Sequence, residues 1–250
     1  MRIKNWIAFA LSLWLLGGGT ALAGSSGWGL RFTENGEPPV GNAGREELRA
    51  YDAWYIGDTG GNTVYLTFDA GYENGHTSEI LDVLRDKNVP AAFFVVGSYI
   101  KGNPELTRRM ADEGHLVGNH TMTHPDMSAI SDMTSFKDEL GRTEEYYREV
   151  TGADLPRYYR PPRGVYSIEN LKMAKELGYK TVFWSLAYVD WIVDKQPTPE
   201  AAFSKLLPRI HPGAVVLLHS TSKTNAEILG RLIDEYRGMG YTFDSLDHLA

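Results

Sequence analysis

The sequence predicts an α/β protein in which helices cover a parallel sheet. Short apolar runs, such as residues 64–68 and 214–218, alternate along the chain with segments whose apolar residues recur at helical spacing. The clearest helical stripe runs from Ile228 to Tyr236. This alternation is typical of parallel strands joined by crossover helices. A closed barrel and an open doubly wound sheet both fit the pattern.

The expected elements follow in chain order. Apolar runs bounded by turn residues predict strands at 64–69, 91–96, 115–119, 158–161, 181–186, 214–219 and 241–243. Glycine often follows the last turn of a helix, because it readily adopts the left-handed conformation. Helices that end before such a glycine are predicted over 103–113, 167–177 and 223–237. About seven strands without an internal repeat predict one domain.

The first residues have the composition of a secretory signal peptide. Arg2 and Lys4 precede an apolar run over 6–16, and the small-residue pattern 21–23 follows it. The run is shorter than the roughly 20 residues that a membrane-spanning helix needs. We therefore expect cleavage after Ala23 and export, whereas an uncleaved segment would serve as an N-terminal membrane anchor.

An irregular N-terminal arm is expected after the signal peptide. Residues 24–62 are rich in glycine, asparagine, proline and charge, and Pro38-Pro39 is a turn signal. The alternating strand and helix pattern begins at Thr63. The expected organisation is a signal peptide over 1–23, the arm over 24–62 and one folded domain over 63–245.

Composition and charge restrict the class of partner. The 250-residue chain has 25 lysines and arginines against 32 aspartates and glutamates, which gives a formal net charge of -7. Such an acidic balance argues against duplex nucleic acid or an anionic membrane surface as the main partner. The chain has no cysteine, so it forms no disulfide and its stability must come from packing.

Three apolar runs end in an ionisable residue. Asp69 follows 64–68, His120 follows 116–119 and His219 follows 215–218. The carboxyl ends of parallel strands form the active-site edge of barrels and of doubly wound sheets alike. We therefore expect these side chains to converge. Each also has a structural interpretation, because aspartate before glycine is common in turns and a histidine beside the core can be satisfied locally.

His120 and His124 are candidate metal ligands. They lie four residues apart in the segment HTMTHP, so one helical turn or compact loop can direct both imidazoles at one ion. Imidazole suits zinc, cobalt, nickel and iron. The same spacing also fits histidines that cap the next segment. Similarly, the segment 160–164 can be a rigid turn and Asp190-Trp191 a half-buried loop anchor.

In chain order, these segments resemble the motifs of the polysaccharide deacetylase family, whose shared unit is the NodB homology domain. TFDAG at 67–71 resembles the family's TFDDG, and HTMTHP at 120–125 resembles its HTxxHP. RPPRGVY at 160–166, DW at 190–191 and LLHS at 217–220 resemble its three later motifs. The resemblance covers 63–245. It implies a distorted (β/α) barrel, usually of seven strands, that hydrolyses an acetyl group on a sugar.

The resemblance also implies catalytic roles. Asp69 matches the general base that takes a proton from water, and Arg160 would pair with it and keep it ionised. His219 matches the general acid that protonates the departing nitrogen, and Asp190 matches its carboxylate partner.

The positions that would contact substrate follow from the same motifs. Trp191 and Leu217 would wall the pocket for the acetyl methyl group, although Leu217 also fits ordinary core packing. Pro161 and Tyr166, from the arginine-containing motif, are further substrate-binding candidates.

A divalent metal ion is the cofactor that the resemblance implies, with His120 and His124 as ligands. Zinc is the first expectation, with cobalt, nickel, iron, manganese and magnesium as alternatives. The family usually has a second aspartate as third ligand, where this chain has Ala70. We therefore expect weak binding by two histidines plus water or substrate oxygens. Glu73 and Asp126 are substitute ligands to consider, though both also fit solvated surface carboxylates.

Within the family, the segment 65–75, Trp28-Gly29 and 55–58 most resemble the PdaA-type N-acetylmuramic-acid deacetylases of spore-formers. The implied partner is the glycan strand of peptidoglycan, stripped of its stem peptide at muramic acid. Deacetylation there prepares the muramic δ-lactam of the spore cortex. The implied location is extracytoplasmic, in the cell wall or the intermembrane space of the forespore.

Three other functions remain open on the sequence. A deacetylase acting on N-acetylglucosamine, in peptidoglycan or chitin, or on acetylated xylan would share the same motifs. A non-catalytic binder of wall glycan would explain Ala70. A glycosidase on a barrel would need two carboxylates that flank the bond, for which Asp69 and Glu73 are candidates.

Overall fold

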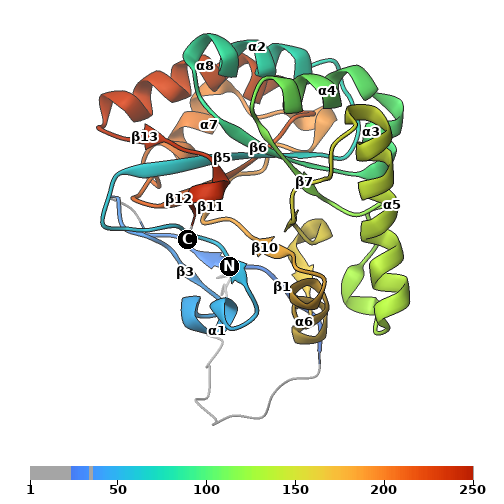
Figure 1. Ribbon diagram of the computed structural model, residues 1–250. Helices are drawn as coiled ribbons and strands as arrows, with labels where there is room; N and C mark the ends of the chain where they lie inside the picture. The colour runs from blue at the N-terminus through green and yellow to red at the C-terminus, as the bar shows by residue number, and fades with distance from the viewer. Residues whose placement is uncertain (1–23, 34–35, 250) are drawn as a thin grey trace, which may run out of the picture.

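The computed structural model describes residues 24–33 and 36–249 (Figure 1), so the expected signal peptide lies outside the described residues. The central sheet is parallel, with the strand order β11, β12, β5, β6, β7, β8, β10, β4, and β13 also pairs with β5. Its strands are β4 (Ala53–Trp54), β5 (Thr63–Ala70), β6 (Ala91–Val95), β7 (Leu116–Asn119), β8 (Tyr158–Tyr159), β10 (Lys180–Val182), β11 (Leu186–Ala187), β12 (Ala214–His219) and β13 (Thr242–Phe243). The predicted α/β class is confirmed.

Helices cover the outer face of this sheet (Figure 1). They are α2 (Thr77–Lys87), α3 (Gly97–Gly102), α4 (Pro104–Asp112), α5 (Met133–Thr151), α6 (Ile168–Glu176), α7 (Pro199–Leu206) and α8 (Lys223–Gly238). The three helices predicted before a glycine correspond to α4, α6 and α8. Polar caps begin several of them, since the Ser222 side chain accepts a hydrogen bond from the Asn225 N–H at the start of α8. None of the helices in the described ranges is both long and apolar enough to cross a bilayer.

The strand predicted over 181–186 is wrong in detail, because the segment forms two short strands, β10 and β11. Between them the backbone changes partner: the Phe183 N–H donates to the Trp54 carbonyl, and the Ser185 N–H donates to the Val215 carbonyl. β10 pairs with β8 and β4, whereas β11 pairs with β12 at the other end of the strand order. One segment thus joins the two sides of the curved sheet into an incomplete barrel.

The N-terminal arm is more ordered than predicted. It contains the strands β1 (Ser26–Gly27), β2 (Leu30–Arg31) and β3 (Val40–Gly41) and the helix α1 (Arg45–Arg49), and β4 joins the central sheet. β1 pairs antiparallel with β9 (Val165–Tyr166). The Trp28 Nε1–H donates to the Trp184 carbonyl at 2.9 Å, and the Trp28 ring stacks on Phe183. Sequence patterns missed these pairings because two-residue strands have no measurable periodicity.

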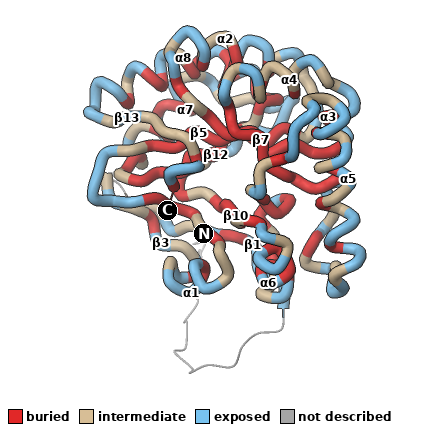
Figure 2. Tube along the Cα trace, in the orientation of Figure 1, coloured by how far each residue is buried: buried red, intermediate tan, exposed pale blue. Residues whose placement is uncertain are grey.

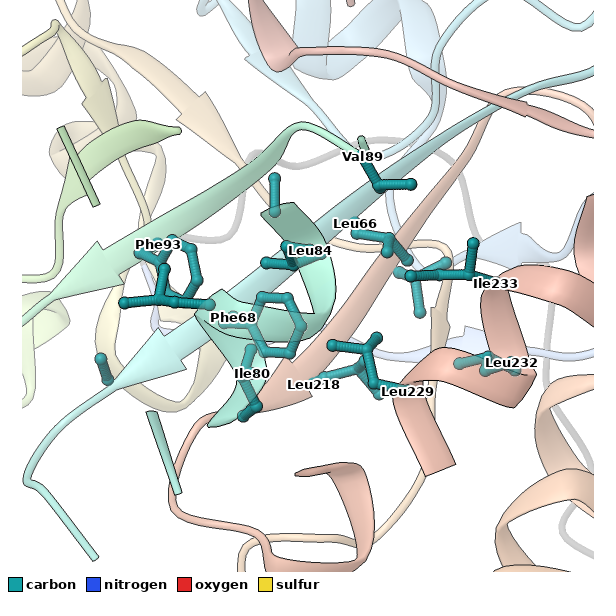
Figure 3. Close-up of a cluster of buried hydrophobic side chains, with 14 of the residues drawn as sticks. Leu66, Phe68, Ile80, Leu84, Val89, Phe93, Leu218, Leu229, Leu232 and Ile233 are labelled. Carbon is teal, nitrogen blue, oxygen red and sulfur yellow. The ribbon is translucent and has the colours of Figure 1, made fainter. Parts of the chain in front are cut away.

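The main core lies between β5, β6 and β12 and the helices α2 and α8. Alternate residues of β5 point outward, so Leu66 and Phe68 pack in one apolar cluster with Leu84 and Leu229 (Figure 3). Figure 2 shows the central strands buried and the outer sides of the helices exposed. Complete burial of each large side chain stabilises the fold by about 1.5–3 kcal/mol. Phe68→Ala would lower the free energy of unfolding by about 3–5 kcal/mol, because it also leaves a cavity in the core.

The other alternate residues of β5 point into the barrel. An apolar floor there includes Tyr65, Phe94 and Val215. Next along β5, Thr67 and Asp69 are both buried. Asp69 pairs in register with His219 of β12, so the two residues occupy adjacent positions at the strand ends. The period of the strand therefore brings a carboxylate and an imidazole to one edge of the barrel.

Candidate active site

A cleft of about 750 Å³ opens at this edge. Its lining includes six of the residues predicted from sequence, namely Asp69, His120, His124, Trp191, Leu217 and His219. They come from β5, β12 and the loops after β7 and β11. The predicted convergence of Asp69, His120 and His219 at the strand ends is thus observed.

Asp69 is held by Arg160 immediately behind the cleft. The Arg160 side chain is completely buried, and its Nη1 donates to Asp69 Oδ1 at 2.7 Å. Its Nη2 donates to Thr67 Oγ1 at 3.0 Å, its Nε donates to the Val182 carbonyl at 2.9 Å, and its Cζ lies 4.1 Å from the centre of the Phe94 ring. These contacts fix the guanidinium in a single orientation.

The electrostatic surroundings keep Asp69 ionised. Burial alone would raise the pKa of its carboxyl group, but the charge of Arg160 holds the pKa below its usual value. Oδ1 is used by Arg160, whereas Oδ2 lies on the side of His120. Asp69 is therefore a buried but charged carboxylate with one oxygen available to a small molecule in the cleft.

His120 and His124 are both set up as neutral imidazoles. Burial lowers the pKa of His120 to about 4, and partial desolvation also lowers the pKa of the more exposed His124. The Arg160 carbonyl lies 2.8 Å from His120 Nδ1, so this nitrogen carries the proton and donates it. His120 Nε2 is then unprotonated and faces Asp69 Oδ2 at 3.5 Å. Two electron-rich atoms that face each other favour a cation, or a water that donates to both, between them.

The loop that carries the two histidines has a strained backbone. Thr121 and His124 have φ angles of 70° and 59°, in the left-handed region that residues other than glycine rarely adopt. The carboxylate of Glu139 on α5 restrains it by accepting from Met122 N, Thr123 N and Thr123 Oγ1 at 2.8–3.0 Å. This loop is thus preorganised by a carboxylate that the sequence analysis did not identify.

The two histidines can bind a divalent ion only if solvent or substrate oxygens supply the other ligands. The two rings are 4.9 Å apart between centroids, and neutral imidazole is a ligand for the metals of this class. Ala70, at the position of a possible third ligand, is completely buried in the apolar core cluster. Over the described ranges, no three histidine, aspartate, glutamate or cysteine side chains are grouped to hold a metal ion. Two imidazoles with solvent or substrate oxygens are the donor set available.

His219 is tied to Asp190 from two directions. Asp190 is almost completely buried and accepts from His219 Nδ1 at 2.7 Å and from the His219 backbone N–H at 2.8 Å. Burial lowers the pKa of His219, but the charge and hydrogen bond of Asp190 more than offset this effect, so the net pKa is raised. His219 Nε2 is left for the cleft, and the raised pKa favours the protonated ring that a general acid needs.

Asn225 of α8 supports this pair and was missed by the sequence analysis. Its Nδ2 donates to Asp190 Oδ2 at 2.6 Å and to the His219 carbonyl at 3.0 Å, and its Oδ1 accepts from the Tyr188 hydroxyl. A buried polar residue near a helix start carries no sequence signal of its role. Thr67 was also missed, although its two-residue spacing from Asp69 on a strand places both on one face.

The predicted substrate-binding residues divide into two groups. Trp191 is exposed, and its ring centroid is 5.7 Å from that of His219, while Leu217 lies beside it in the lining. Tyr166 and Pro161 do not line the cleft. Tyr166 packs against Phe183 in a cluster under the arm, because β9 pairs with β1 and turns this side chain away.

The two substitute ligands are engaged elsewhere. Glu73 accepts from the Gly75 N–H at 2.6 Å and from the Tyr99 hydroxyl at 3.1 Å. Asp126 caps a short helical turn and lies 3.5 Å from Arg163. Neither carboxylate lines the cleft. Glu73 is thus a half-buried anchor of its loop, and Asp126 is a surface carboxylate as expected.

Comparison with known proteins agrees with this geometry. A family model described as polysaccharide deacetylase matches residues 56–182. The peptidoglycan-N-acetylmuramic acid deacetylase PdaA of Bacillus subtilis is 44% identical over 241 residues, covering 94% of this chain and 91% of the relative. The solved structure of Bacillus subtilis PdaA, a family 4 carbohydrate esterase, gives a TM-score of 0.86 at 43% identity and covers 91% of this chain and 97% of that one.

A relative with a different named substrate is also similar. The peptidoglycan-N-acetylglucosamine deacetylase of Bacillus cereus is 33% identical over 187 residues, which is 73% of this chain and 66% of the relative. The two PdaA matches cover more than nine tenths of this chain, whereas the family model ends before Asp190 and His219. The chain belongs to the polysaccharide deacetylase family.

Proposed function

We propose that this protein removes the N-acetyl group from N-acetylmuramic acid in peptidoglycan strands that lack the stem peptide. The observation that carries the proposal is that one cleft is lined by ionised Asp69 and, at the adjacent strand end, by the Asp190-bound His219. The 44% identity to PdaA over nearly the whole chain supports the muramic acid substrate.

The proposed reaction is hydrolysis of an amide. Asp69 takes a proton from water as the water oxygen bonds to the acetyl carbon. His219 then gives a proton to the nitrogen as the carbon–nitrogen bond breaks, and the products are acetate and a free amine. Arg160 keeps Asp69 charged, and Asp190 keeps His219 protonated and oriented. Trp191 and Leu217 would enclose the acetyl methyl group.

His120 and His124 would hold the divalent ion, zinc in the first instance. When bound, such an ion polarises the acetyl carbonyl and lowers the pKa of a coordinated water. With Ala70 in place of a carboxylate, the affinity is proposed to be weak. His120 is held ready for this role by the Arg160 carbonyl, which fixes its tautomer.

The proposed setting is extracytoplasmic, because the substrate lies there. Residues 1–23 are proposed as a cleaved signal peptide, and 63–245 as the catalytic domain. Preparation of the muramic δ-lactam of the spore cortex is the proposed physiological role. The product of the reaction, an unacetylated amine beside a free lactyl carboxylate, has the two groups that such a lactam joins.

A glycosidase function is not favoured by the cleft. Hydrolysis of a glycosidic bond needs two carboxyl groups about 5–10 Å apart that both face the bond. Among the described residues that line the cleft, Asp69 is the single carboxylate. Glu73, the partner considered from sequence, is bound to Tyr99 and to its own loop.

Product analysis with the Asp69→Asn variant tests the proposal. Purified protein is incubated with peptide-free glycan strands, and released acetate and new reducing ends are both measured. We expect acetate without new reducing ends, and a loss of about 10³-fold in Asp69→Asn with binding of the strand retained. New reducing ends would indicate a glycosidase, and glycan binding without acetate release would indicate a non-catalytic binder.

A further inference from the structure

A second groove adjoins the catalytic cleft. Its volume is about 420 Å³, and it shares the side chains of Trp184, Trp191 and Leu217 with the cleft. A polymer seated with one sugar in the cleft therefore has a continuous surface along which to extend. The lining is mainly apolar and aromatic, which suits the C–H faces of sugar rings.

The N-terminal arm supplies one wall of this groove through Leu30 and Phe32. The arm is anchored next to the catalytic strands, because the Trp28 N–H donates to the Gly164 carbonyl at 2.8 Å and its Nε1–H donates to the Trp184 carbonyl. Trp184 itself lines both the groove and the cleft. The arm is thus part of the surface beside the site, and its placement is coupled to the cleft wall.

Two cations face the same groove in an otherwise acidic protein. The guanidinium carbon of Arg209 lies 4.2 Å from the centre of the Phe32 ring, which orients the group while leaving its N–H edge available. Lys205 of α7 is exposed in the lining. Within the described part of the chain, neither cation forms a salt bridge, and no carboxylate lines the groove. A planar arginine without a carboxylate partner is suited to an incoming carboxylate.

We propose that this groove is a second saccharide subsite, which binds another muramic acid of the same strand through its carboxylate. The inference rests on the proposed function, since peptide-free muramic acid carries a free lactyl carboxylate and recurs along the strand. Arg209 forms the charge-assisted contact, Lys205 adds a second positive charge, and Trp191 and Phe32 pack on the sugar. The subsite distinguishes an anionic glycan from an uncharged one such as chitin.

Calorimetric titration of the full chain with two matched oligosaccharides tests the subsite. One is a peptide-free muramic-acid-containing oligosaccharide, and the other is the same compound with its carboxylates reduced to alcohols. The variants are Arg209→Gln and Lys205→Gln. The matched control is Arg231→Gln. The guanidinium carbon of Arg231 also lies over a phenylalanine ring, 4.6 Å from the centre of Phe203, but Arg231 lines neither the groove nor the cleft.

We expect the wild type to bind the anionic compound about tenfold more tightly than the reduced one. Arg209→Gln should lose this preference, Lys205→Gln should lose part of it, and Arg231→Gln should keep it. Equal binding of the two compounds by the wild type, or an unchanged preference in Arg209→Gln, overturns the subsite.

Acetate release, measured on the same samples, separates the two proposals. If the protein releases acetate but binds both oligosaccharides equally, the deacetylase proposal is supported and the subsite proposal is wrong. If the protein binds the anionic oligosaccharide more tightly through Arg209 but releases no acetate, the subsite proposal is supported and the deacetylase proposal is wrong.

Discussion

Asp190 accepts two hydrogen bonds from a single residue, His219, one from the ring Nδ1 at 2.7 Å and one from the backbone N–H at 2.8 Å. The double contact fixes both the position of the strand end and the rotation of the imidazole. It also assigns the Nδ1 proton, so the Nε2 position is the one that serves the cleft. The general-acid proposal depends on this pair.

Asp190→Asn should move the alkaline limb of the pH–activity profile to lower pH. Protonated His219 is the active form, so activity is lost as pH rises through its pKa, and Asp190 raises that pKa. We also expect kcat at neutral pH to fall about 100-fold. The profile of kcat against pH measures both effects. Asp126→Asn, on the surface, is the control, and an unmoved alkaline limb in Asp190→Asn would refute the assignment.

Arg160→Met should destabilise the fold by about 3–5 kcal/mol, because it leaves the buried Asp69 carboxylate without its partner. Arg163→Met provides the comparison: its side chain is 56% exposed, and the expected change is within about 0.5 kcal/mol. Denaturant unfolding of both variants measures the difference. Equal stabilities would mean that the Asp69–Arg160 pair contributes nothing to holding the site.

Glu139→Ala should reduce kcat/KM at least tenfold, although Glu139 does not line the cleft. It removes the acceptor for three donors of the histidine loop, and the left-handed residues Thr121 and His124 then relax. Glu145→Ala on the same helix, exposed to solvent, should leave kcat/KM unchanged. If the substitution only displaces the histidines, excess zinc should restore part of the activity of Glu139→Ala. Similar kcat/KM values for Glu139→Ala and Glu145→Ala would show that the histidine loop keeps its conformation without Glu139.

Chelation should abolish activity, and zinc should restore it. Because two histidines are the available protein ligands, we expect the metal to be lost on simple gel filtration without a chelator. Metal content and acetate release before and after filtration measure this. Full activity in protein repurified without metal would show that His120 and His124 have another role.

The apolar strand pattern of this chain predicted the site residues that lie at the ends of strands. Asp69 and His219 each follow an apolar strand, and parallel pairing in register made them neighbours. The division of 181–186 into two strands was not predictable, because it results from a change of partner between Trp54 and Val215. Tyr166 illustrates the same limit, since its direction is set by pairing with an arm strand two residues long.

Supporting residues were predicted less well than the residues they support. Asn225 and Glu139 act through hydrogen bonds between segments far apart in the chain, and such contacts have no fixed spacing in sequence. Arg160 was identified through its motif, whereas its stacking on Phe94 and its bond to Thr67 required the folded barrel.

Mass spectrometry of peptide-stripped peptidoglycan, treated with the mature protein and added zinc, tests the central claim most directly. The mass of each sugar reports where acetyl groups are lost. We predict acetyl loss confined to muramic acid, with chain length unchanged. Loss on glucosamine instead, or no loss on either sugar, would contradict the account.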